Sequence, residues 1–184
     1  SIATLVTQAV LSLSALGKQR DFDGNFRADL LWRANAGGAY GIWLMNGTTA
    51  TVTAGIGLAA PWQVTHTANF SGDGRHDLLI RNATTGSTVM WLMSGVANTG
   101  LATLLADPSW TATHTGDFND DGNADIIWRH APTGTTSVWL MNGTSFAGGG
   151  TLLVSPAWQV QFTGDFDGDG KDDLLWRNAT TGET

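Results

Sequence analysis

A repeat of 48 residues runs through the chain and limits its possible folds more than any other feature of the sequence. Four acidic segments begin at the same phase, at residues 21, 69, 117 and 165, with no insertion between copies. All nine tryptophans occupy only three phases of the repeat. One of these phases contains Ile80 in place of tryptophan, so it requires bulk and apolar character more than an indole N–H. A repeat of this kind cannot bury its apolar face alone, so the period predicts a stacked array of units.

Each copy of the repeat contains four short apolar runs separated by turn-forming residues. Examples from the third and fourth copies are SVWLMNG, TLL, WQVQFTGDF and DLLWRN. Short runs bounded by Gly, Asn, Ser and Thr are typical of antiparallel strands, and a repeat of about 40 to 50 residues with four strands is typical of a propeller blade. We therefore predict an all-β, β-propeller-type fold of four-stranded antiparallel blades, with about four blades in the chain.

The repeat defines a single repeat domain, residues 1–184. Residues 21–68, 69–116 and 117–164 are complete repeats, residues 165–184 begin a fourth, and residues 1–20 are expected to supply partial closing strands. Two architectures are compatible with these parts. Either three blades and one composite blade close a small ring, or the chain forms an open arc that joins another chain or further sequence. We favour the arc, because an unpaired blade edge readily associates.

Composition argues against several classes of function. The chain has no cysteine, a formal net charge of −7 and no cluster of Lys or Arg. Thiolate chemistry is therefore excluded, and binding to nucleic acid or to an anionic membrane is disfavoured. No apolar run approaches the ~20 residues that a membrane-spanning helix requires. No nucleophile with a base, glutamate pair or phosphate-binding loop stands apart from the repeat, so we predict that the protein is not an enzyme.

Aspartate is concentrated in the loops of the repeat. The chain has one Glu and fifteen Asp, and fourteen of the aspartates fall within residues 21–29, 69–77, 117–125 and 165–173. A solvated surface would also use Glu and Lys and would spread its charge. The last window, DFDGDGKDD, places carboxylates at loop positions 1, 3, 5 and 9. Four anions in so small a volume are costly without a cation, and short carboxylates on a Gly-containing loop suit Ca²⁺.

The loop spacing begins like an EF-hand but does not continue like one. Position 12, where an EF-hand has a bidentate Glu, is Trp176 within an apolar run. Ligation that ends at position 9, directly before a strand, instead resembles the calcium loops of FG-GAP or VCBS-type repeats, found in integrin α-subunit propellers and many bacterial secreted proteins. The resemblance covers residues 21–184 and rests on DFxxDGxxDLLWR followed by VWLMNG. It implies calcium-binding propeller blades.

Carried over residue by residue, the resemblance implies side-chain ligands at positions 1, 3, 5 and 9 and a backbone carbonyl ligand at position 7. The implied sets, in the order of positions 1, 3, 5, 7 and 9, are Asp165, Asp167, Asp169, Lys171 and Asp173; Asp117, Asn119, Asp121, Asn123 and Asp125; Asn69, Ser71, Asp73, Arg75 and Asp77; and Asp21, Asp23, Asn25, Arg27 and Asp29. Up to four Ca²⁺ ions are therefore expected, with the last two loops as the best sites and the first loop as the poorest.

Phe26 distinguishes the first loop from the others. The other loops have Gly at position 6, at residues 74, 122 and 170, where we expect a tight turn or a positive φ. An alternative interpretation of all four loops is that Asp, Asn and Gly form Asx turns without metal. Asp120 and Asp172 fall at phases without a ligand role, so we expect both to face solvent.

Arginine recurs at one phase, directly after a tryptophan phase. Four such arginines could line a central channel that binds an anion. We prefer a structural role, in which each arginine stacks on aromatic rings or donates to loop carbonyls. The set is Arg33, Arg81, Arg129 and Arg177.

The leading functional hypothesis is an extracellular, calcium-stabilised binding or adhesion module, with a lectin as one form, that contacts glycans or proteins. Millimolar extracellular calcium saturates even sites with a Kd of about 10⁻⁴ M, which favours a secreted or cell-surface location. Two alternatives stay open: a structural subunit that self-associates into a ring or filament, and the non-catalytic propeller part of a larger secreted hydrolase or lyase. Nucleic acid is not an expected partner, and membrane insertion is not expected.

Overall fold

The computed structural model describes residues 20–184, and every regular element in this part of the chain is a β-strand. The closing strands expected within residues 1–20 lie outside the described residues, apart from Arg20 itself. The strands are β1 (Leu30–Arg33), β2 (Tyr40–Asn46), β3 (Thr49–Gly55), β4 (Trp62–Ala68), β5 (Asp77–Asn82), β6 (Thr88–Ser94), β7 (Ala97–Leu105), β8 (Trp110–Gly116), β9 (Asp125–His130), β10 (Thr135–Asn142), β11 (Ser145–Val154), β12 (Trp158–Gly164) and β13 (Asp173–Asn178). Residues 20–184 contain no helix that could cross a membrane.

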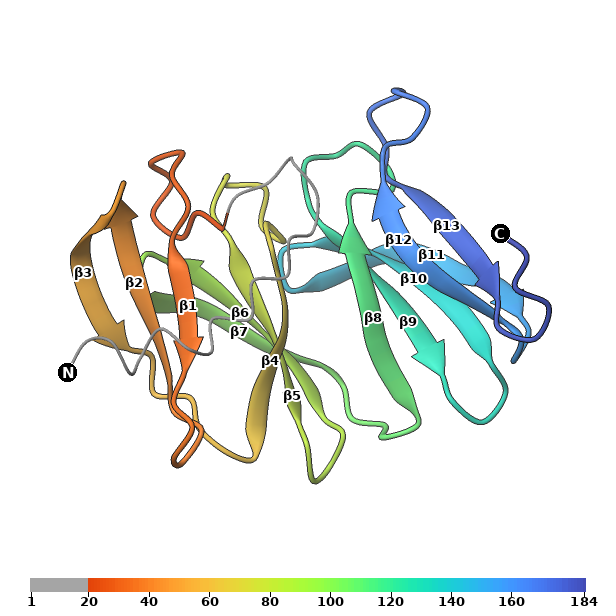
Figure 1. The fold of residues 1–184 in the computed structure, drawn as a ribbon, viewed down its shortest axis with the longest axis horizontal. Coiled ribbons are helices and arrows are strands. Elements are labelled where there is room, and N and C mark those ends of the chain that lie inside the picture. Colours follow the sequence, from red (N-terminus) through yellow and green to blue (C-terminus); the bar gives the residue numbers. More distant parts are fainter. Residues whose placement is uncertain (1–19) are drawn as a thin grey trace.

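Antiparallel pairing divides the strands into four sheets that follow one another along the molecule (Figure 1). The two central sheets have four strands in chain order, β4 to β7 and β8 to β11. The first sheet contains β1, β2 and β3, and the last contains β12 and β13. Each central sheet begins with the strand that ends one copy of the repeat and continues with three strands of the next copy. The predicted all-β fold is confirmed, and the predicted four-stranded antiparallel unit is confirmed for both central sheets.

The second strand of the second sheet, β5, packs against both neighbouring sheets. In β5, Leu78 and Ile80 belong to a buried cluster with Phe22, next to the first sheet. Leu79 belongs to a second cluster that contains Trp128 of the third sheet. Successive strand residues point to opposite faces, so a strand that is covered on both faces needs a continuous apolar run. This explains why the repeat reads DLLIRN and DIIWRH instead of alternating apolar and polar residues.

The tryptophan phase that contains isoleucine in one copy is a packing position. Trp128 is fully buried, and its indole Nε1 has no hydrogen-bond partner in the described structure. Ile80, at the equivalent position of β5, is equally buried. The prediction that this phase requires bulk and apolar character more than an N–H donor is confirmed at these two positions.

Two of the recurrent arginines connect a sheet to the next one. Arg81 donates from Nη1 to the carbonyl of Trp110 at 2.6 Å. Arg129 donates from Nη2 to the carbonyl of Ser155 at 2.8 Å. Both acceptors lie where the chain passes from one sheet to the following one. The preferred structural role is confirmed for these two arginines.

Candidate metal centres

The four acidic loops lie at the same end of the sheets (Figure 1). Three of them join the first and second strands of a sheet: residues 69–76 between β4 and β5, 117–124 between β8 and β9, and 165–172 between β12 and β13. The first loop leads into β1. The fold therefore presents four equivalent loops, each of which ends with an aspartate at position 9, at or directly before the start of the strand that follows the loop.

The aspartate at loop position 1 closes its own turn. Asp165 Oδ1 accepts a hydrogen bond from the N–H of Gly168 at 2.7 Å, and its Oδ2 accepts one from Gly170 at 3.1 Å. Equivalent bonds from loop amides reach Asp21 and Asp117. The Asx turns of the alternative interpretation are therefore present. Carboxylates at positions 3 and 5 form such bonds too: Asp167 accepts the N–H of Asp169 at 3.0 Å, and Asp169 accepts the N–H of Lys171 at 2.8 Å.

Position 6 has the positive φ that its glycines indicated. The angle is 83° at Gly74, 83° at Gly122 and 92° at Gly170. Phe26 takes the same left-handed backbone, at φ 62°. The first loop thus closes with the turn of the other loops, although a residue with a Cβ pays a steric cost of about 1 to 2 kcal/mol in this region.

In the first three loops, the aspartate at position 9 ties the loop to the strand that follows the one the loop leads into. Asp77 Oδ2 accepts the N–H of Phe70 at 2.9 Å, and its Oδ1 accepts the N–H of Met93 in β6 at 2.8 Å. The same two bonds form at Asp29 and Asp125. Burial raises the pKa of Asp77 and of Asp125 to about 6, although these hydrogen bonds act in the opposite direction. The position-9 carboxylate is therefore a structural brace as well as an implied ligand.

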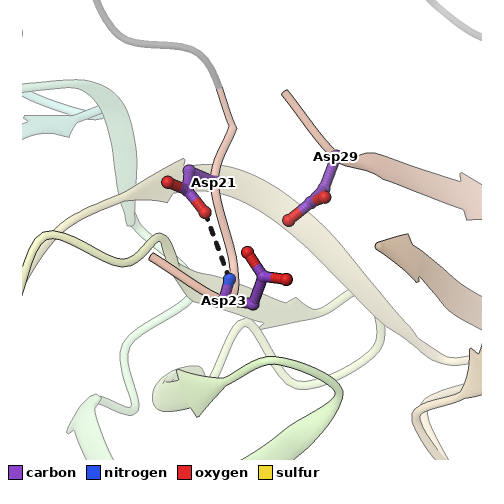
Figure 2. Close-up of side chains that lie close together, drawn as sticks. All are labelled: Asp21, Asp23 and Asp29. Carbon is purple, nitrogen blue, oxygen red and sulfur yellow. Dashed lines mark hydrogen bonds between the residues drawn. The ribbon is translucent and has the colours of Figure 1, made fainter. Parts of the chain in front are cut away.

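Two of the loops gather three carboxylates around one point. The sets, with one carboxylate oxygen of each residue within 4.8 Å of the others, are Asp21, Asp23 and Asp29 in the first loop and Asp165, Asp167 and Asp173 in the last. Figure 2 shows the first set, in which the N–H of Asp23 also donates to Asp21 at 3.2 Å. Partial burial, together with the charges of Asp29 and Asp21, raises the pKa of Asp23. The first loop therefore crowds its charges as closely as the last loop does.

The second and third loops do not bring three carboxylates together, and some of their acidic side chains have other partners. Asp73 forms an ion pair with Arg75 at 3.0 Å, and Asn119 Nδ2 donates to Asp121 at 2.9 Å. Within residues 20–184, neither loop brings three acidic or histidine side chains as close together as the other two loops do. In the second loop, however, Asn69 Oδ1 is buried without a hydrogen-bond partner. A buried oxygen without a donor is costly, and a cation would satisfy it.

The donor set suits a hard divalent cation. Positions 1, 3, 5 and 9 offer carboxylate, amide and hydroxyl oxygens, and position 7 offers a backbone carbonyl. Oxygen-only sets of this kind are typical of Ca²⁺ and Mg²⁺, whereas Zn²⁺ and copper favour His or Cys. Some implied ligands have other partners: Asp169 pairs with Lys171 at 3.6 Å, and Asn25 Nδ2 donates to Asp23 at 3.0 Å. Two acidic clusters could thus hold metal ions such as Ca²⁺.

Asp172 does not face solvent, which corrects the prediction from the sequence. Its Oδ2 accepts the N–H of Asp117 at 2.8 Å, and its own N–H donates to the carbonyl of Asp117 at 2.7 Å. A Cβ at Gly116 would lie 2.5 Å from Asp172 Oδ2. The small residue before the third loop is therefore the sequence signal that could have indicated this contact. Asp120 is exposed, as expected.

Comparison with protein families identifies a matching region in the second half of the chain. Residues 117–176 match the model of the FG-GAP-like repeat. This segment begins at position 1 of the third acidic loop and ends in β13, so it includes two acidic loops. A search of curated proteins and a search of solved structures each gave no match. The chain therefore contains an FG-GAP-like repeat, as the loop spacing and the strand motif indicated.

Proposed function

We propose that the protein is an extracellular, calcium-stabilised binding module that contacts a glycan or a protein and performs no catalysis. The observation that carries this proposal is the crowding of three carboxylates within 4.8 Å in two loops of a chain with an FG-GAP-like repeat. Repeats of this family often bind calcium or other ligands and are typically non-catalytic. The recognition surface is formed by exposed loops or by grooves between the sheets.

Calcium has a structural role in this proposal. In the two central sheets the acidic loops join the first two strands, and the position-9 aspartates connect these loops to the third strand. An ion in each loop would hold these parts together and would remove the repulsion among the carboxylates. Ca²⁺ suits this role better than Mg²⁺, because Ca²⁺ accepts 6 to 8 oxygen ligands in flexible geometry and the four loops differ in their ligands.

The location outside the cell follows from the expected affinity. Loops with neutral ligands or internal ion pairs should bind calcium weakly, and only extracellular calcium saturates sites with a Kd of about 10⁻⁴ M. The net charge of −7 also opposes binding to nucleic acid or to an anionic membrane. A glycan or protein outside the cell is therefore the proposed partner.

The test is a glycan array probed with the labelled full chain in millimolar calcium and again in EDTA. The proposal expects binding to a defined group of glycans in calcium and its loss in EDTA. The double variant Asp167→Asn/Asp169→Asn, which changes exposed side chains, should weaken the binding. Affinity capture with extracellular protein libraries, in calcium and in EDTA, tests whether the partner is a protein. Binding that is indifferent to calcium in both screens would contradict the proposal.

A second candidate function, self-assembly through the end sheets, is favoured by a specific observation. Phe166 in the last loop is 60% exposed, whereas Phe70 at the equivalent position is fully buried. At the other end, Leu30 is 42% exposed, whereas its equivalent Leu78 is fully buried. The first and last sheets lie at opposite ends of the molecule (Figure 1). We propose a second copy of this chain as the occupant, because the last sheet of one copy and the first sheet of another would repeat the internal interface.

Sedimentation velocity over a range of protein concentrations tests the self-assembly candidate. Association should increase with concentration and should be lost in Phe166→Asp and in Leu30→Asp. Leu101→Asp is the matched control, because Leu101 is an exposed leucine on β7 of a central sheet. A strict monomer at all concentrations, or equal loss in the control, would reject this candidate.

A further inference from the structure

One backbone contact recurs at every junction between successive acidic loops. The N–H at position 8 of a loop donates to the carbonyl at position 1 of the preceding loop. The three bonds are His76 to Asp21 at 2.6 Å, Ala124 to Asn69 at 2.7 Å and Asp172 to Asp117 at 2.7 Å. Adjacent loops are therefore linked directly, and not only through the sheets that carry them.

The peptide group that makes this contact also contains the implied backbone ligand. In a planar trans peptide the carbonyl points away from the N–H, and the peptides between positions 7 and 8 are trans. The N–H of position 8 belongs to the same peptide as the carbonyl of position 7. A cation at that carbonyl would polarise the peptide and would strengthen its N–H as a donor to the preceding loop.

The side chain at position 8 adds a second bond at two of the three junctions. Asp172 Oδ2 accepts the N–H of Asp117 at 2.8 Å. His76 Nδ1 accepts the N–H of Asp21 at 3.3 Å. At the remaining junction position 8 is Ala124, whose side chain has no acceptor. The link between the third and fourth loops therefore includes a charge-assisted hydrogen bond, which is stronger than a neutral one.

The residue before the third loop leaves space for the Asp172 side chain. Gly116 lies beside Asp172, and a Cβ on it would approach the Asp172 carboxylate to 2.5 Å. At the other two junctions the residue equivalent to Gly116 is Ala68, where position 8 is Ala124, and Arg20, where position 8 is His76. The close approach of Gly116 and Asp172 is therefore particular to the junction between the third and fourth loops.

We propose that the position-8 contacts couple neighbouring metal loops, so that a cation in one loop raises the affinity of the next, and that Asp172 is the positioning residue for the third and fourth loops. The inference rests on the proposed calcium binding. Asp172 is not a ligand in it, because its Oδ2 holds the backbone N–H of Asp117, the residue whose side chain is the position-1 ligand. The coupling is reciprocal, since linkage between two binding sites acts equally in both directions.

A calcium titration of the ¹⁵N-labelled full chain, followed by NMR, tests this proposal. The amides of Gly122 and Gly170 report on the third and fourth loops separately. In Asp172→Ala the calcium affinity reported by Gly122 should fall about three- to tenfold, which is the usual net contribution of one hydrogen bond. Asp172→Asn loses the same charge but keeps a neutral acceptor, so its calcium affinity should fall less than that of Asp172→Ala.

Gly116→Ala is a second variant, which displaces the Asp172 side chain and should reproduce the effect of Asp172→Ala. Equal loss in Asp172→Ala and Asp172→Asn would assign the effect to charge and overturn the positioning role. An unchanged affinity in both Asp172→Ala and Gly116→Ala would overturn the coupling. If neither glycine amide of the wild-type chain responds to calcium, the proposed calcium binding itself fails, which is a distinct result.

Discussion

The two ends of the sheets close their turns with different chemistry. At one end, the neutral Asn82 closes the turn after β5, because its Oδ1 accepts the N–H groups of Thr84 and Thr85 at 2.9 and 3.0 Å. At the other end, Asp165 accepts loop N–H groups in the same manner. One neutral oxygen therefore suffices to close the turn after β5, whereas the last acidic loop uses Asp167 and Asp169 as further acceptors of loop N–H groups. Carboxylates this close together also repel one another, which a neutral turn avoids. The acidic end thus concentrates negative charge that turn formation alone does not require, and two of its loops could hold a cation.

Calcium should affect stability at the acidic end more than any single substitution does. A ligand at 100 times its Kd stabilises a protein by about 2.7 kcal/mol per site. Two occupied loops would thus contribute about 5 kcal/mol, and each kcal/mol raises the Tm by roughly 2 to 4 °C in a chain of this size. Calorimetry should therefore show a Tm at least about 10 °C higher in calcium than in EDTA.

Charge-matched variants separate the two ends in this experiment. The double variant Asp167→Asn/Asp169→Asn removes two exposed carboxylates from the last acidic loop and should reduce the calcium-induced shift. The double variant Asp107→Asn/Glu183→Gln removes two charges outside the acidic loops and should leave the shift unchanged. Equal reductions in both variants would mean that calcium acts through net charge and not through the loops.

Without calcium, Asp125→Ala should destabilise the protein more than Asn82→Ala does. Asp125 is buried and accepts the N–H groups of Phe118 and Met141, and a hydrogen bond to a charged group contributes about 1.5 to 3 kcal/mol. We expect a loss of about 3 kcal/mol, against about 1 kcal/mol for the neutral turn. Urea denaturation in EDTA measures both values. A larger loss for Asn82→Ala would contradict the bracing role of position 9.

Lowering the pH should weaken the calcium effect while it stabilises the metal-free protein. Burial raises the pKa of Asp77 and Asp125 from 3.8 to about 6. Between these values the folded chain binds protons that the unfolded chain does not, so these two groups lower the metal-free stability as the pH rises through this window. Calcium needs the ionised carboxylates, so its affinity at the second and third loops should increase as the pH rises through about 6.

Melting curves in EDTA and in calcium, at about pH 5 and about pH 7, test this expectation. At the lower pH the metal-free Tm should be higher and the calcium-induced shift smaller. A metal-free Tm that increases from pH 5 to pH 7, together with a constant calcium shift, would contradict it.

Phe26→Gly should give the smallest effect, a gain. Phe26 holds a left-handed backbone that costs about 1 to 2 kcal/mol for a residue with a Cβ, and its side chain is exposed. Part of this gain is offset by the greater freedom of glycine in the unfolded chain, so we expect about 1 kcal/mol. Gly74→Phe is the reciprocal variant and should destabilise the second loop. Equal stability of all three proteins in urea would reject the steric argument.

Much of the fold was predictable, because the repeat fixes the strands and loops locally. Period, apolar runs and turn residues indicated the all-β architecture, and the spacing of Asp and Gly indicated the acidic loops and their positive φ. Phe26 was misleading, because the bonds from its loop amides to Asp21 hold the same turn without glycine. The preference for glycine at a positive φ is therefore outweighed by the hydrogen bonds of the whole loop.

The long-range bonds of the acidic end were not predictable from local patterns. Asp125 bonds to Met141 in a different strand, and Asp172 bonds to Asp117 in a different loop. Both contacts depend on how strands and sheets pack, which spacing within one loop does not reveal. Some of these contacts can be inferred by comparing equivalent positions of neighbouring repeats, as the contact between Gly116 and Asp172 illustrates.

The most direct measurement is an anomalous difference map from crystals of this chain grown in calcium. Calcium binding by the loops predicts peaks in the acidic loops, with carboxylate oxygens of Asp165, Asp167 and Asp173 about 2.3 to 2.6 Å from the ion, and no peak at the turn after Asn82. A map without density in any of the four loops, with these carboxylates turned toward solvent, would show that the loops do not bind calcium.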